Sequence, residues 1–206
     1  MKQWLLVVSI MLCLAASASA GNALTPEAPI SIAPDDTSVT FLAEVNGKYL
    51  YQPTRHFAVF KDGKNGEKSV FRALANPVEF YDALLKIHAR PGGNMTLQNK
   101  EITHVEGQAF KVTVTWAGAP RSYTIDQVIV DSNHKPIRMK FGGNIENAEK
   151  LNTGCLLCLD SCPVGIVSNA AYTYGAVEKR KEVAFTGNPD VLPPDGMRVW
   201  VTLSLK

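Results

Sequence analysis

Three of the four cysteines in this 206-residue chain lie within eight residues, at Cys155, Cys158 and Cys162, and Pro163 follows directly. The spacing is C-x2-C-x3-C-P. A bacterial ferredoxin run is C-x2-C-x2-C-x3-C-P, and Asn152 stands where its first cysteine would be. Three thiols this close in sequence stay close in any compact fold. They must therefore be disulfide-bonded, bound to a metal or reactive, and the fold has to accommodate that chemistry in one short segment.

Three interpretations of the cysteine segment stay open on sequence grounds. One is a disulfide with one free thiol, which suits an oxidising compartment. The second is a metal or iron–sulfur centre with Cys155, Cys158 and Cys162 as ligands and with Asn152 or His134 as an accessory ligand. The third is thiol exchange by a C-x-x-C pair, although no βαβ pattern surrounds it.

The first twenty residues have the composition of a secretory signal peptide. Lys2 precedes an apolar run over 4–16, and a small-residue ending follows at 17–20. The apolar run is too short to cross a bilayer as a stable helix. The sequence therefore predicts a signal peptide over 1–20, no transmembrane span after its removal, and a periplasmic or extracellular location. A twin-arginine pair is absent from this segment, which predicts threading of the unfolded chain and argues against export of a preassembled cluster.

The remaining sequence predicts a flexible tether over 21–37, rich in Pro and Ala, and a single mostly β domain over 38–206. Hydrophobic residues make up 46% of the chain and charged residues 19%, which is enough to form a real core. The formal net charge is +2 and no basic run could follow a phosphate backbone, so nucleic acid is excluded as a partner. The partner that we expect is an exported redox or membrane-associated protein.

Alternating apolar residues predict the strands of an antiparallel sheet. Asn46-Gly47 predicts a hairpin into a strand at 48–51, and the loop at 61–67 is expected to join a second strand pair. The other predicted strands lie at 39–45, 111–116, 121–125, 127–130, 137–141 and 199–205. These short strands and their Gly and Pro turns predict a sandwich-like or open-barrel arrangement.

One main helix is predicted near 76–89. Asn76 is its N-cap, Pro77 occupies the first helical position, and Glu79 is placed for a capping box. The cysteine segment near 154–163 is predicted as a loop or short helix, because positions i, i+3 and i+7 share one helical face. The predicted class is therefore α+β, mostly antiparallel β.

The sequence contains no catalytic signature. We find no G-x-S-x-G, H-E-x-x-H, phosphate-loop or dinucleotide motif, and the four histidines are scattered. The chain is therefore predicted not to be an enzyme. A short repeat, Gly-Gly-Asn at 92–94 and again at 142–144, predicts two tight turns with positive φ, and the alternative is a pair of backbone-lined binding loops.

Several segments resemble the bacterial YdjY-like family. They are 141–144, the cysteine segment within 154–169, and 187–196, with similarity also at 81–85 and 91–94. The resemblance covers the chain from about residue 38 onward. Members of that family are described as ferredoxin-like proteins of the 4Fe-4S type without an established activity. The resemblance therefore implies an iron–sulfur cluster at Cys155, Cys158 and Cys162.

The sequence as a whole predicts an exported, non-enzymatic binding or redox-linked module built around the three cysteines. Those cysteines would form a disulfide plus a free thiol, or a soft-metal site for zinc or copper. The first alternative is a ferredoxin-like electron carrier with an iron–sulfur cluster. The second is a structural or partner-binding domain whose cysteine loop is stapled by a disulfide.

Overall fold

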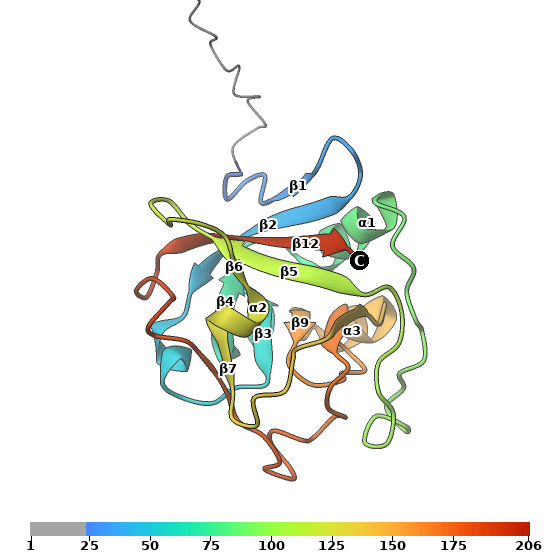
Figure 1. Ribbon diagram of the computed structural model, residues 1–206. Coiled ribbons are helices and arrows are strands. Elements are labelled where there is room, and N and C mark those ends of the chain that lie inside the picture. Colours follow the sequence, from blue (N-terminus) through green and yellow to red (C-terminus); the bar gives the residue numbers. More distant parts are fainter. Residues whose placement is uncertain (1–23) are drawn as a thin grey trace, which may run out of the picture.

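The computed structural model describes residues 24–206 of the chain. The predicted signal peptide and the first residues of the predicted tether lie outside the described residues. Ten strands form one sheet (Figure 1). They are β1 (Ile30–Ile32), β2 (Ser38–Val45), β3 (His56–Phe60), β4 (Ser69–Ala73), β5 (Phe110–Thr115), β6 (Tyr123–Thr124), β8 (Met139–Phe141), β9 (Cys155–Cys158), β10 (Val167–Asn169) and β12 (Arg198–Leu205).

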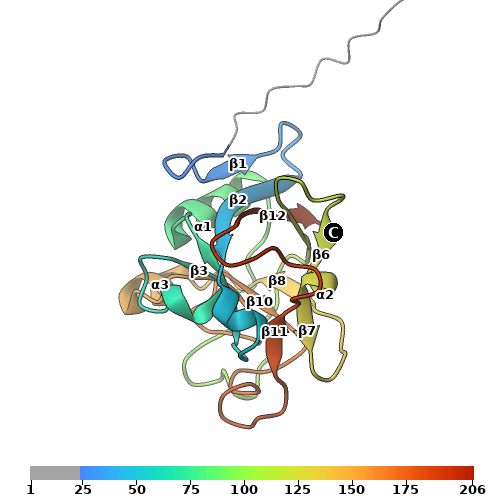
Figure 2. The ribbon, with the colours of Figure 1, turned by 90° about the vertical axis from the view of Figure 1, so that its left-hand side faces the viewer.

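The sheet is large, mixed and curled into a half-barrel (Figures 1 and 2). Its strand order is β6-β5-β12-β2-β4-β3-β9-β10-β8, and β1 pairs with β2. β5 and β8 lie near opposite ends of this order, and a bridge between Ala109, just before β5, and Lys140 of β8 connects them. A separate antiparallel pair is formed by β7 (Ile129–Asp131) and β11 (Phe185–Gly187). The strand that carries two of the cysteines, β9, therefore lies inside the sheet.

The helices are short, and the longest of them confirms the main helix predicted near 76–89. α1 (Pro77–Lys86) begins at Asn76, whose side chain accepts a hydrogen bond from Glu79 N at 2.9 Å. It buries Phe80, Ala83 and Leu84 against the sheet. The others are α2 (Ile125–Val128), α3 (Ile145–Leu151) and the 3₁₀ turns η1 (Gly47–Leu50) and η2 (Gly66–Lys68). Within residues 24–206, no helix has the length and apolarity needed to span a membrane.

The predicted class, α+β and mostly antiparallel β, is confirmed. Most strand pairs are antiparallel, with β3–β4 and β9–β10 as the parallel exceptions. The apolar faces of the strands enclose one main core, to which Phe41, Phe71 and Phe141 contribute fully buried rings. The large buried area supports the sequence-based expectation of a real core.

The structure adds detail to four local predictions, and two of them, the strands at 48–51 and 127–130, were wrong. Asn46-Gly47 leads into η1 instead of a hairpin strand. The loop at 61–67 joins the predicted strand pair, β3 and β4, and these strands run parallel, so the connection is a crossover containing η2. Residues predicted as a strand at 127–130 begin as α2, where Thr124 and Gln127 form a capping box. The range predicted as a tether includes β1, which pairs with β2.

The cysteine segment was predicted as a loop or short helix, and its first half is instead the strand β9. All four residues of β9 are buried, and β3 and β10 pair with it on either side. A short apolar run that is buried on both faces has no alternation to reveal its period, so the helical spacing of the cysteines was not informative.

Candidate metal centre

The pairing of β3 with β9 creates the centre. The two strands run antiparallel, with His56 opposite Cys158 and Val59 opposite Cys155. In a regular strand Cys155 and Cys158 would point to opposite faces. The register shifts between His56 and Val59, and such irregularities re-aim side chains. The Cys155 and Cys158 sulfurs and a His56 ring nitrogen consequently lie within 4.8 Å of one another.

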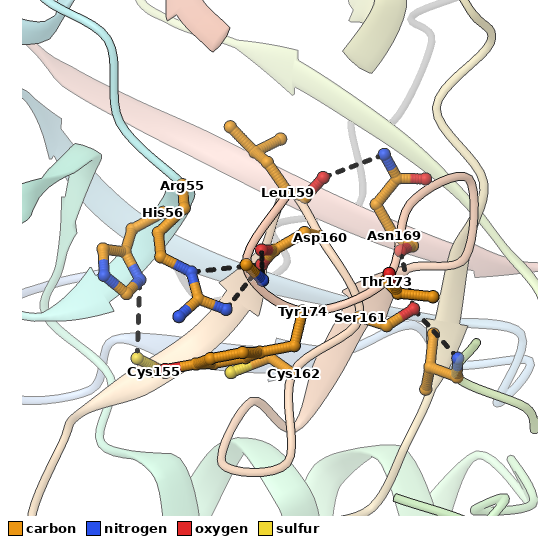
Figure 3. Close-up of polar contacts among 12 residues, drawn as sticks. Arg55, His56, Cys155, Leu159, Asp160, Ser161, Cys162, Asn169, Thr173 and Tyr174 are labelled. Carbon is orange, nitrogen blue, oxygen red and sulfur yellow. Dashed lines mark hydrogen bonds and ion pairs between the residues drawn. The ribbon is translucent and has the colours of Figure 1, made fainter. Parts of the chain in front are cut away.

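These three donor atoms could hold a metal ion. His56 Nδ1 and Cys155 Sγ are 3.6 Å apart (Figure 3). Nitrogen at ~2.0 Å and sulfur at ~2.3 Å from a tetrahedral Zn²⁺ would be separated by roughly the same distance. His56, Cys155 and Cys158 are all buried. All three cysteines of the described part of the chain are free, with no disulfide among them.

Cys162 lies beside Cys158 but outside this group of three donors. Its loop is held by two asparagines of the α3 segment. Asn144 Nδ2 donates to the carbonyl oxygens of Cys162 and Gly165 at 2.9 and 3.1 Å, and Asn147 Nδ2 donates to that of Pro163 at 3.0 Å. The Cys162 thiol is therefore presented by a fixed backbone.

The buried thiols perturb one another's acidity. Hydrogen bonding with Cys155 and with Cys162, together with burial, raises the pKa of Cys158 well above its usual range. Hydrogen bonding with Cys158 and then with His56 lowers the pKa of Cys155, and contact with Cys158 and the charge of Arg55 lower that of Cys162. Burial opposes charge on His56, but its bond to Cys155 raises the imidazole pKa. Cys155 and Cys162 thus favour the thiolate form, whereas Cys158 favours the protonated thiol until a metal displaces its proton.

A buried ion pair lies next to the thiols. Arg55 Nε and Nη2 donate to Asp160 Oδ1 at 3.1 and 2.6 Å, and Gly175 N donates to Oδ2 at 3.2 Å (Figure 3). Burial raises the pKa of Asp160, while Arg55 opposes this effect. The Tyr174 ring centroid lies 4.0 Å from Arg55 Cζ and 4.4 Å from Lys100 Nζ. The pair therefore fixes a guanidinium close to the sulfur atoms.

Ser168 of β10 lies opposite Cys158 in the parallel pairing of β10 with β9. Its Oγ is the only buried side-chain oxygen or nitrogen in residues 24–206 without a hydrogen-bond partner. A Cβ on Gly165 would lie 2.9 Å from both Ser168 Oγ and Cys158 Sγ. The missing side chain of Gly165 therefore keeps the space between this hydroxyl and this thiol clear.

The two Gly-Gly-Asn segments are the tight turns that the sequence predicts. Gly93 and Gly143 have φ of +64° and +87°. The segments also contact each other, since Gly93 N donates to the Gly142 carbonyl oxygen at 3.0 Å. Asn94 Nδ2 donates to His104 O at 2.9 Å, much as Asn144 anchors the Cys162 loop. The Gly-Gly-Asn segment at 142–144 thus holds the Cys162 loop in place, and neither segment supplies one of the three candidate ligands.

The two accessory candidates lie elsewhere. Asn152 is the left-handed C-cap of α3, and its carbonyl oxygen accepts a hydrogen bond from Lys64 N. His134 is exposed in the turn after β7 and lines a different cavity with Asp126 and Lys135. Sequence reasoning missed His56, which lies 99 residues before Cys155. Its only signal was its place at the start of an apolar strand, which does not distinguish a ligand from a core histidine.

Comparisons with known proteins place the chain among relatives of unknown activity. The model of the YdjY domain matches residues 30–204. The "Uncharacterized protein YdjY" of Escherichia coli (strain K12) is 52% identical over 184 residues, which cover 89% of this chain and 82% of the relative. No solved structure matches. The family resemblance read from the motifs is confirmed, while neither match carries a ferredoxin-like description.

Proposed function

The chain belongs to the YdjY domain family, and we propose that it is a metal-binding module that holds a soft divalent ion such as Zn²⁺. Its ligands are His56 Nδ1 and the thiolates of Cys155 and Cys158. The observation that carries the proposal is that these three donor atoms lie within 4.8 Å of one another. Two cysteines and one histidine form a known protein ligand set for zinc, one that leaves a fourth position open.

The spacing of the donors favours one ion over an iron–sulfur cluster. A cubane places four irons and four sulfides between its ligands, so its ligand atoms lie farther apart than those around a single ion. The 3.6 Å between His56 Nδ1 and Cys155 Sγ suits two ligands of one ion. An electron carrier of the ferredoxin type is therefore the second candidate, supported by the C-x2-C-x3-C-P spacing alone.

The proposed setting is an exported protein, on the basis of the signal-like segment at 1–20. Neighbouring thiols pair readily in an oxidising compartment. A bound ion prevents this, because its ligand thiolates are no longer free to attack a disulfide. The proposed ion and the reduced state of the cysteines therefore support each other.

Metal content and competition titrations test the proposal. The purified chain should retain one equivalent of Zn²⁺, and a chromophoric chelator should remove it with release of reactive thiol. His56→Gln should weaken Zn²⁺ binding by at least ~10-fold, since one of three ligands is lost. The matched control is His134→Gln, which changes an exposed histidine on a different cavity and should leave affinity unchanged.

Three results would contradict the proposal. Iron, acid-labile sulfide and absorbance near ~400 nm would identify a cluster instead. A Cys155–Cys158 disulfide in freshly isolated protein, detected by mass spectrometry after alkylation, would identify a stapled loop. Equal Zn²⁺ affinity of the His56 and His134 variants would also remove His56 from the ligand set.

A further inference from the structure

A cavity of about 310 Å³ adjoins the metal centre, and Cys155 and Cys162 line it. Ligand pockets for small molecules start at about this size. Two of the three proposed ligands, His56 and Cys155, therefore line this cavity. An ion bound by the proposed ligands would therefore be reachable from this cavity.

The lining of the cavity is cationic. Arg55, Lys68 and Lys100 contribute positive charge, and Glu178 is the acidic residue on its wall. Neither lysine takes part in an ion pair within the described part of the chain. Arg55, Lys68 and Lys100 outnumber the carboxylates of Glu178 and of the Arg55 partner Asp160 by three to two, before any charge on the Cys162 thiol is counted. A small anion is therefore the ligand that the charge favours.

Arg55 is built to receive such an anion. Its side chain is 6% exposed, and Asp160 binds Nε and Nη2 while Tyr174 packs on the guanidinium. Nη1 donates no hydrogen bond among residues 24–206. The guanidinium is thus held rigidly with donor capacity left over, and its order is established before a ligand arrives.

The metal centre offers the second attachment point. His56, Cys155 and Cys158 supply three ligands, and Cys162 lies outside their group. A divalent ion with two thiolates and one neutral imidazole carries no net charge, so it would accept one further soft anionic donor. The preferred fourth donor is a thiolate.

Resting on the proposed metal site, we propose that the cavity binds a small thiol that also carries a carboxylate. Its thiol releases a proton to solvent, and the resulting thiolate occupies the fourth position on the ion. Its carboxylate pairs with Arg55 and Lys100. The ligand class is therefore a low-molecular-weight mercaptocarboxylate, and the protein binds it without changing it.

The test uses the full chain loaded with Co²⁺, whose absorption bands report the number of thiolate ligands. 3-Mercaptopropionate should add a thiolate-to-cobalt band and shift the visible bands. 2-Mercaptoethylamine, which has the thiol and the opposite charge, should bind at least ~10-fold more weakly. Propionate, which has no thiol, should leave the spectrum unchanged. Metal analysis after dialysis should show that cobalt is retained throughout.

A lysine variant checks the electrostatic part. Lys100→Gln should weaken 3-mercaptopropionate binding about threefold, as expected for one partly exposed charge. It should leave 2-mercaptoethylamine binding equal or tighter. The control Lys86→Gln changes a lysine on α1 that lines a different cavity and should match the unmodified chain. Lys68→Gln repeats the test at the cavity edge should the first variant fold poorly.

The outcomes separate this inference from the proposed function. Failure to bind Co²⁺ or Zn²⁺ overturns both. Normal metal binding with a spectrum that does not respond to 3-mercaptopropionate overturns the mercaptocarboxylate site alone. So does a loss of thiolate-to-cobalt absorbance in Cys162→Ser before any thiol is added, because Cys162 would then already fill the fourth position.

Discussion

Ser168 and Cys158 lie opposite each other on the parallel strands β10 and β9, and the fully buried Ser168 hydroxyl has no hydrogen-bond partner among residues 24–206. An unsatisfied buried hydroxyl is costly. Cys158 Sγ accepts no hydrogen bond from Ser168 in this structure, and we expect the sulfur of a metal-bound Cys158 to do so. Outer hydrogen bonds of this kind orient ligands and tune metal affinity.

We therefore expect Ser168→Ala to have opposite effects on two measurements. Zn²⁺ affinity should fall ~10-fold, while the free energy of unfolding of the metal-free protein should rise by about 1 kcal/mol. Chelator competition and denaturant titration measure the two quantities. The control is Ser161→Ala, since Ser161 Oγ bonds to Val105 N at 3.0 Å and Asn169 O at 3.3 Å. Its loss should destabilise the metal-free protein.

Gly165→Ala should disturb the same place by steric contact. The new Cβ would lie 2.9 Å from Cys158 Sγ and Ser168 Oγ and 3.4 Å from the Cβ of Cys162. We expect a stability loss of about 1–3 kcal/mol and weaker metal binding, measured by the same two titrations. The double change Gly165→Ala with Ser168→Gly should recover part of the stability, because it removes one of the two closest contacts. No recovery would argue against this geometry.

Breaking the Arg55–Asp160 pair should be far more costly than breaking a surface pair. Asp160→Asn leaves the guanidinium charge buried without its partner, and we expect a loss of about 3–5 kcal/mol in the free energy of unfolding. Lys179→Met breaks the exposed pair of Lys179 with Glu101 and should cost less than about 1 kcal/mol. Similar losses in the two variants, by denaturant titration, would contradict the assignment of Arg55 to a rigid buried pair.

Tyr172 should make stability depend on pH in the alkaline range. Burial, with a smaller contribution from Asp131, raises the pKa of Tyr172 from 10 to about 12. Because the folded-state pKa is the higher one, this contribution to stability is complete below pH ~10 and is lost as pH rises toward ~12. Unfolding free energies measured across that range should fall more steeply for the unmodified chain than for Tyr172→Phe. Parallel slopes would refute the assignment.

The sequence predicted what local physics determines. Asn76, Pro77 and Glu79 located the start of α1 because capping acts over three residues. The alternation in 199–205 located β12 because one face of that strand is buried. The family resemblance was likewise confirmed from short motifs.

What the sequence could not predict depends on pairing between distant segments. Cys155 and Cys158 lie in a strand because β3 and β10 cover both edges, and β3 is far from β9 in the sequence. His56 joins them through an irregular register that no periodicity encodes. Asn152 matched the ferredoxin spacing but ends α3, where its left-handed backbone serves as a cap.

The antiparallel contact of β3 with β9 has a consequence for the order of assembly. One of the three proposed ligands, His56, lies 99 residues before Cys155 in the sequence, so the complete centre does not exist until a slow, long-range strand pairing has formed. Metal capture at full affinity is thus a late event. Metal binding therefore indicates that β3 has paired with β9. Substitutions that weaken this pairing should lower the metal affinity even where they change no ligand.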